Sequence, residues 1–187
     1  MLNDRLFDLL RKLDADELEE VWIKYLRKTR EDDDFGRRSR EQRVEPISRE
    51  LRYLAAHSIA DIVNRRKEHD YPWDEIIRQV NEKLNLTTTV INDNVRVLED
   101  ALLERLSAVA GKAETFAASR VASQRAIEEL ASQARWAPWS PRRPLTFLKS
   151  VATGRMIWGP NYRKVIPAVL FILSAARTHD VLKEMKA

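Results

Sequence analysis

Apolar residues recur at intervals of three and four along most of this chain, a spacing that places them on one face of an α-helix. The pattern predicts a first helix over residues 3–29. It is interrupted near Leu13, where Asp14 and Glu17 have the spacing of a capping box, a pair of side chains that satisfies the first amides of a helix. We therefore expect two short helices at an angle within this range.

The same spacing predicts four helices in the middle of the chain. Pro46 is well suited to a first helical turn, and a helix follows it over residues 47–69. The next two helices span residues 73–86 and 90–106, with a threonine-rich turn between them that favours an N-cap. An alanine-rich helix then runs from Gly111 to about residue 134.

Two segments lack this pattern. Residues 30–45 are charged and have almost nothing to bury, so we expect a loop or a frayed helix end there. Three prolines between residues 138 and 144 make a stiff connector. Beyond it, helices are predicted over residues 145–157 and 162–186, and Pro167 is expected either to kink the second or to mark its first turn.

Composition supports a purely helical fold. The chain has four glycines among 187 residues, whereas an average usage of ~7% would give about 13. So few glycines leave little chain for tight hairpins or phosphate-binding loops. We expect an all-α protein, a compact multi-helix bundle of about six to eight helices with the proline-rich connector before the C-terminal helices. Residues 1–134 would form a helical domain, and residues 135–187 would pack on the same core.

Charge divides the chain unevenly. Residues 130–179 contain no aspartate or glutamate but eight cations, which leaves residues 1–129 with a net charge of about −4. Aromatic side chains are interleaved with the cations, and an anionic partner would find one preferred face. We call the following residues the basic face: Arg135, Trp136, Trp139, Arg142, Arg143, Lys149, Arg155, Arg163 and Lys164.

The basic face has two interpretations. Its cations could follow phosphates, anionic lipid headgroups or an acidic protein surface, or they could pair with the acidic excess of residues 1–129 while the tryptophans are core. The adjoining apolar run, Val165 to Ala176, is too short to span a membrane, which takes ~20 residues. It is expected to be a buried core helix, with an interfacial segment as the alternative.

Few residues suggest catalysis. There is no cysteine, the three histidines are far apart in sequence, and no nucleotide-binding, hydrolase or metal-ligand motif is present. We therefore expect no enzymatic activity, no cofactor and no metal site. The N-terminus carries charges where a signal peptide needs an apolar run, so we expect a cytoplasmic protein, with attachment to a membrane surface as the alternative.

One segment has the outline of a DNA-reading unit. Residues 76–102 form a helix, a short turn and a second helix, and the start of the second helix would face bases. Arg96 and two asparagines there have side chains able to discriminate guanine and adenine. Against this, Asp93, Glu99 and Asp100 would repel phosphate. The residues that would read bases are Asn92, Asn94 and Arg96.

Three blocks of sequence carry a family resemblance. They are LFDLLRKLDADELEEVWIKYLRK (6–28), ISRELRYLAAHSIADIVNRRKEHDYPWDEIIRQVNEKLNL (47–86) and GPNYRKVIPAVLFILSAAR (159–177). Together they resemble the YaaW-type bacterial proteins of the ubiquinol-cytochrome c chaperone-like superfamily. The most specific pieces are the Ser58-Ile59 pair, the EKLNL helix end and Tyr162-Arg163 followed by Ile166-Pro167-Ala168-Val169. The chain departs from the family in a shortened stretch ahead of the third block, residues 151–159.

The resemblance implies an all-helical, non-enzymatic protein that acts on other proteins, and it supplies no catalytic residue. Joined to the charge pattern, it leads us to expect a chaperone-like or regulatory interaction protein that uses the basic face. A protein partner is expected first. Nucleic acid, an anionic membrane surface and a second copy of the chain are the alternatives.

Overall fold

The computed structural model describes most of the chain in six stretches: residues 4–26, 34–56, 71–86, 94–111, 116–136 and 162–186. Within the fifth stretch, side chains are described for residues 122–133 only. All regular structure in these stretches is helical, with no strand among them. The elements are α1 (Arg5–Leu10), α2 (Ala15–Glu20), a π-helix (Val21–Leu26), a 3₁₀ turn (Phe35–Arg37), α3 (Arg40–Ala55), α5 (Trp73–Lys83), α6 (Val95–Ala110), α7 (Phe116–Trp136) and α9 (Tyr162–Glu184).

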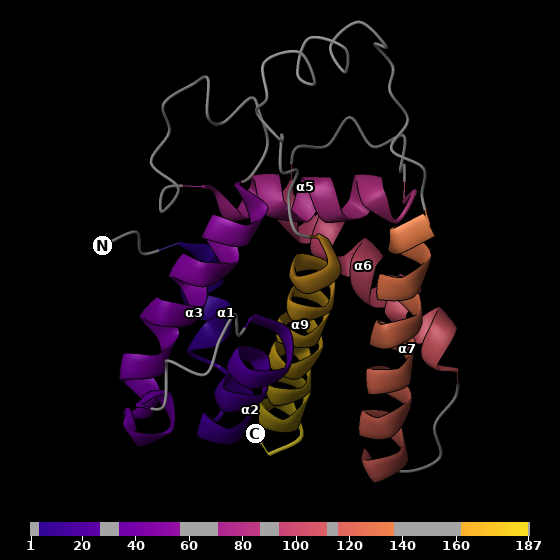
Figure 1. Ribbon diagram of the computed structural model, residues 1–187. Helices are drawn as coiled ribbons and strands as arrows, with labels where there is room; N and C mark the ends of the chain where they lie inside the picture. Colours follow the sequence, from indigo (N-terminus) through magenta and orange to yellow (C-terminus); the bar gives the residue numbers. More distant parts are fainter. Residues whose placement is uncertain are drawn as a thin grey trace, which may run out of the picture.

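Helix α9 is the core helix of the bundle. The segment from Val165 to Leu173 is buried on every side, as expected for a helix that is apolar all round. It contacts α1, α3 and the π-helix on one side and α6 and α7 on the other, while α5 crosses one end. Figure 1 shows α9 running through the middle of the bundle with its C-terminal end opposite α5. The expected all-α bundle is thereby confirmed, and the apolar run is a core helix.

The predicted break in the first helix is confirmed. Helix α1 ends at Leu10 and α2 begins at Ala15, with Asp14 as its N-cap. The carboxylate of Asp14 accepts from the amide of Glu17 at 2.8 Å, and the Glu17 carboxylate accepts from the amide of Asp14 at 2.9 Å. Both halves of the capping box are therefore present.

The expected loop over residues 30–45 is wrong for the part that the structure describes. Phe35 is buried and stacks on Trp22 with ring centroids 4.6 Å apart. Helix α3 begins at Arg40, seven residues before the predicted start, and Pro46 lies inside it. The reason is Arg43, whose buried guanidinium donates to the carbonyls of Ala15 (2.7 Å), Gly36 (2.6 Å) and Arg38 (3.0 Å) and so ties this charged segment to the core.

The remaining boundaries follow the predictions, apart from the end of α3. Helix α5 begins at Trp73 as expected and ends at Lys83, and α6 begins at Val95, later than predicted. Helices α7 and α9 match the expected alanine-rich and C-terminal helices, and α9 continues through the buried Pro167. The second predicted helix is shorter than expected, because α3 ends at Ala55 and not near residue 69. The predicted helix over 145–157 lies outside the described residues.

Candidate functional site

The two described cations of the basic face that have defined side chains lie in the first turn of α9. Arg163 is exposed and forms no ion pair with a described residue, whereas Lys164 donates to the carbonyl of Leu26 at 3.2 Å. Lys164 therefore satisfies the end of the π-helix, which is a structural role. Beside it, burial raises the pKa of Tyr162 to about 12, with the nearby carboxylates of Glu82 and Glu75 contributing.

The rest of the basic face is not assembled by the described structure. Arg135 and Trp136 are the last two residues of α7, and their side chains are outside the described part. Trp139, Arg142, Arg143, Lys149 and Arg155 lie outside the described residues altogether. Figure 1 nevertheless shows that α7 ends and α9 begins at the end of the bundle crossed by α5.

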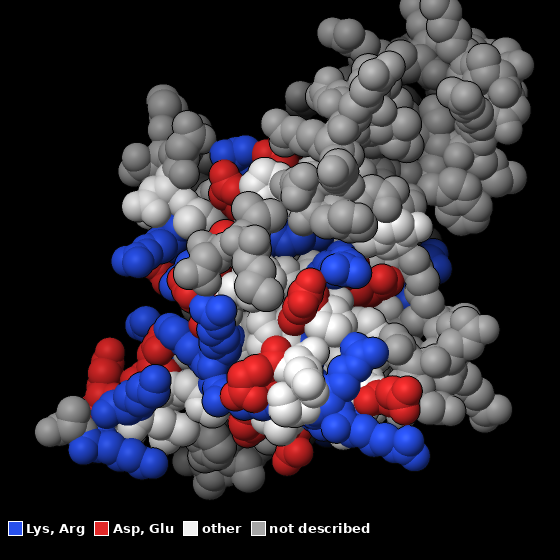
Figure 2. Space-filling view, turned by 90° about the vertical axis from the view of Figure 1, so that its left-hand side faces the viewer, with Lys and Arg blue, Asp and Glu red and all other residues white. Residues whose placement is uncertain are grey.

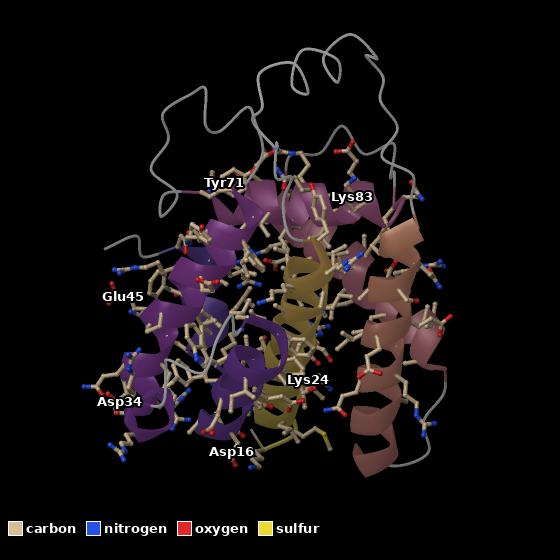
Figure 3. All side chains as sticks on the ribbon, in the orientation of Figure 1. Asp16, Lys24, Asp34, Glu45, Tyr71 and Lys83 are labelled. Atoms are coloured by element: carbon tan, nitrogen blue, oxygen red, sulfur yellow. The ribbon has the colours of Figure 1, made fainter. Side chains whose placement is uncertain are left out.

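Most described ion pairs are formed by cations outside the basic face. Arg5, Lys12, Lys24, Arg37, Arg43, Arg49, Arg52 and Arg78 pair with carboxylates of the bundle, and His179 contacts Glu17. Lys24, labelled in Figure 3, bridges Glu20 of α2 and Glu128 of α7. On the face shown in Figure 2, cationic and acidic side chains are interspersed. Many carboxylates of residues 1–129 therefore pair with arginines and lysines of the same part of the chain, although its net charge remains about −4.

Helices α5 and α6 contact each other, but the predicted base-reading residues are only partly available. Asn94 is the N-cap of α6, and its side-chain oxygen accepts from the amide of Arg96 at 3.1 Å. Arg96 itself is exposed, and Asn92 lies outside the described residues. A capping asparagine has its oxygen engaged in the helix end, which weakens the DNA-reading interpretation.

The expectation that Glu99 repels phosphate is wrong, because its side chain is buried. Glu99 is 3% exposed, and its carboxylate accepts from the guanidinium of Arg5 at 2.8 and 3.2 Å and from the indole nitrogen of Trp73 at 2.7 Å. The hydrogen bond from Arg5 to Glu99 raises the pKa of Arg5 above its ordinary value. The three side chains join α1, α5 and α6 through a neutralised, hydrogen-bonded group.

A second buried arginine holds the same end of the bundle. Arg52, on α3, is 2% exposed and donates to the carboxylate of Asp4, the carbonyl of Tyr71 and the hydroxyl of Ser48. Asp4 precedes α1, and Tyr71 precedes α5. The half-buried Arg5 and the buried Arg52 therefore both tie elements of the bundle together.

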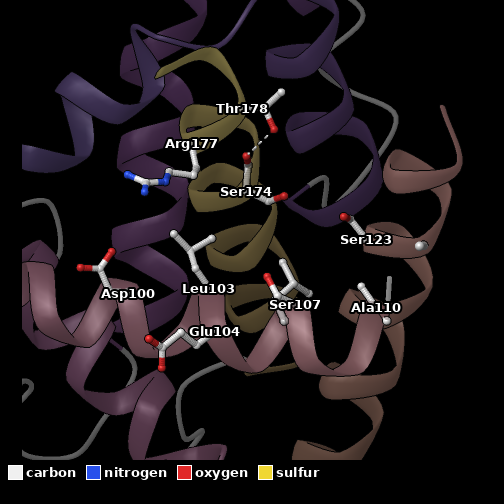
Figure 4. A pocket seen from close by; sticks show the side chains of 12 residues that line it. Asp100, Leu103, Glu104, Ser107, Ala110, Ser123, Ser174, Arg177 and Thr178 are labelled. Atoms are coloured by element: carbon white, nitrogen blue, oxygen red, sulfur yellow. Dashed lines mark hydrogen bonds between the residues drawn. The ribbon is translucent and has the colours of Figure 1, made fainter. Parts of the chain in front are cut away.

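One cavity in the described part of the chain is a groove between α6, α7 and α9. Its volume is about 740 Å³. Figure 4 shows Asp100, Glu104 and Arg177 gathered on one side of it, with the hydroxyl groups of its serines further along. Its lining residues are Asp100, Leu103, Glu104, Leu106, Ser107, Ala110, Gly111, Ala122, Ser123, Ser174, Arg177 and Thr178.

The described lining of the groove combines two carboxylates, one guanidinium and several hydroxyl groups. Its lining includes no histidine, and among the described residues none of its serines hydrogen-bonds to a general base, as nucleophilic catalysis would require. Sequence reasoning missed this site. One signal was available, since Ser174 interrupts the apolar run of α9 and Asp100 and Glu104 are four residues apart on α6.

One group of possible metal ligands occurs where α9 meets α2. Oxygen and nitrogen atoms of Asp14, Glu17 and His179 lie within 4.8 Å of one another. The same carboxylates form the capping box of α2, and the imidazole nitrogen Nε2 of His179 lies 2.8 Å from Glu17. Helix capping and a helix-to-helix hydrogen bond account for this arrangement.

The C-terminal part of α9 is also anchored by an ion pair. Lys12 donates to Asp180 at 2.6 Å, and this hydrogen bond lowers the pKa of Asp180, against a smaller opposing effect of burial. A carboxyl group whose pKa is lowered by folding stabilises the folded state at pH values above the pKa of the unfolded state, which is about 3.9. That contribution is lost as the pH falls through the lower pKa of the folded state.

We therefore expect Asp180→Asn to lower the free energy of unfolding at neutral pH, with the deficit shrinking as the pH falls below about 4. Urea unfolding at a series of pH values measures it. Glu184→Gln, an exposed change on the same helix, is the control and should show no such trend. A deficit of Asp180→Asn that stays constant through the acid range would contradict the pKa assignment.

Helix α9 is long and apolar enough to cross a membrane by length and composition alone. Its most apolar window is 61% buried within the bundle. A core helix of a water-soluble protein passes the same test, and the contacts of α9 on both sides match that case. The structure is compatible with a protein in solution or at a membrane surface.

Comparison with known proteins adds no further assignment. No protein-family model, curated protein or solved structure matches this chain.

Proposed function

We propose that this protein is a non-enzymatic interaction protein, chaperone-like or regulatory, that binds a partner protein through its basic face. The resemblance to YaaW-type proteins is the basis for the chaperone-like class. The partner surface would be acidic, because the stretch that contains the basic face has no carboxylate of its own.

The observation that carries the proposal is the division of charge in the bundle. Described carboxylates such as Glu19, Glu75 and Glu99 already pair with arginines of the N-terminal part. Arg163, at the start of α9, is exposed and forms no ion pair with them. This pattern supports a basic face that is available to a partner, and it counts against complete internal neutralisation.

Co-purification from native lysate tests the proposal, with and without nuclease. The variant is Arg142→Glu/Arg143→Glu, and the matched control is Arg105→Glu/Arg125→Glu, which reverses two exposed arginines outside the basic face. We expect a protein partner that survives nuclease treatment, whose recovery falls in the first variant and not in the control. Rim charges act mainly on association rate, so the loss should be largest at low salt.

Two results would contradict the proposal. If both variants recover the partner as well as the wild type does, the basic face is structural. If nuclease abolishes recovery and the retained species is RNA or DNA, with affinity that falls steeply with salt, the nucleic-acid interpretation replaces it.

A further inference from the structure

The groove between α6, α7 and α9 presents charges of both signs at one end. Asp100 and Glu104 come from successive turns of α6, and Arg177 comes from α9. Among the described residues, neither carboxylate forms an ion pair with this guanidinium, although all three line the same groove. The groove therefore presents both kinds of charge without a direct ion pair between them.

The rest of the groove is polar without charge, over an apolar floor. Ser107 and Ser123 line it from α6 and α7, and Ser174 lines it from α9. Leu103 and Leu106 contribute apolar surface, and Leu106 is 3% exposed. Hydroxyl groups both donate and accept hydrogen bonds, so this part suits an uncharged polar body.

The volume sets the size of the ligand. A cavity of about 740 Å³ lies within the range of ~300 to 1,000 Å³ of small-molecule sites. A ligand carrying only an ammonium would meet Arg177, and a ligand carrying only a carboxylate would meet Asp100 and Glu104. A molecule that carries both groups complements all three side chains, with its ammonium on the carboxylates and its carboxylate on the guanidinium.

We propose that this groove binds a small zwitterionic ligand of the amino-acid type, with one ammonium, one carboxylate and an uncharged polar body. Asp100 and Glu104 hold the ammonium, Arg177 holds the carboxylate, and the serine hydroxyls contact the body. This site is independent of the basic face. Failure of either proposal therefore leaves the other standing.

The test uses three probes with the full-length protein labelled with nitrogen-15. L-Glutamine carries both charges, glutaramic acid is the same molecule without the amino group, and γ-aminobutyramide is the same molecule without the carboxylate. Amide shifts are followed by NMR. We expect saturable shifts for glutamine at Ser107, Gly111, Ser174 and Thr178, with each analogue binding about fivefold more weakly because one exposed ion pair is lost.

Variants then assign each charge to its partner. In Arg177→Gln, glutamine and γ-aminobutyramide should bind equally, because the carboxylate has lost its site. In Asp100→Asn/Glu104→Gln, glutamine and glutaramic acid should bind equally. Arg105→Gln, an exposed change on α6 that does not line the groove, should bind as the wild type does.

Several outcomes would overturn the proposal. One is no saturable shift with glutamine up to its solubility limit, and another is equal binding of all three probes to the wild type. Stronger binding of γ-aminobutyramide than of glutamine would show a simple cation site. Shifts that leave α6 and α9 unaffected would place the ligand elsewhere.

Discussion

Replacing Glu99 with leucine is expected to lower the free energy of unfolding by about 3 kcal/mol, because it leaves a partly buried guanidinium and a buried indole N–H without their acceptor. In the native protein this carboxylate accepts from Arg5 and Trp73. Urea unfolding followed by far-UV circular dichroism measures the change. An acid on a helix would ordinarily be expected at the surface, where the loss would be small.

A graded pair of variants separates the charge from the hydrogen bond. Glu99→Gln keeps an acceptor for the Trp73 indole but removes the charge facing Arg5, so a loss of about 1–2 kcal/mol is expected. Glu104→Gln lies on the same helix with an exposed side chain and should change stability by less than about 0.5 kcal/mol. Equal, small effects of all three variants would contradict the buried network.

The second large effect is expected in α9. Leu170 is fully buried where α9 passes through the bundle, and Leu170→Ala should cost about 3 kcal/mol, from lost apolar burial and the cavity left behind. Leu182→Ala, on the same helix but 36% exposed, is the matched control, with an expected cost below about 0.5 kcal/mol. The same urea titration measures both variants.

A position of α9 on a membrane surface would have the opposite consequence for the stability of Leu170→Ala. If α9 lay on a membrane surface instead of in the core, Leu170→Ala would leave the stability of the protein in solution nearly unchanged and would reduce binding to vesicles. A small stability loss for Leu170→Ala, equal to that of Leu182→Ala, would therefore count against the core position.

Local rules predicted much of the fold from sequence. Apolar spacing located α5, α7 and α9 within a few residues, and the Asp14–Glu17 spacing predicted the break between α1 and α2. These features depend on residues close in sequence, so the chain reveals them directly.

The predictions failed where a local signal was overlooked and where contacts between distant residues determine the structure. Ser39 and Gln42 also have capping-box spacing, and both halves of that box form, yet the charge of residues 30–45 suggested a loop. Arg43 is buried because carbonyls from two other segments accept its hydrogen bonds. No rule based on composition predicts such acceptors. The π-helix at Val21–Leu26 was likewise missed, since a short turn of this kind has no distinct apolar period.

The same distinction between local sequence and the packing of distant segments applies to the two candidate sites. The basic face is a property of composition along one stretch and could be read from the sequence, although most of it lies outside the described residues. The groove is formed by α6, α7 and α9, and its charges come from α6 and α9, two helices that are distant in sequence. Only the packing of those helices brings Asp100, Glu104 and Arg177 together.

The position of α9 in the core of the bundle is tested most directly by amide hydrogen exchange of the full chain, alone and with phosphatidylglycerol vesicles. The amides of residues 168–176 should be among the slowest to exchange in the protein alone, because they open only with global unfolding. Vesicles should not alter their rates. Fast exchange of these amides in solution, with protection appearing only when vesicles are added, would contradict the core position and favour membrane attachment.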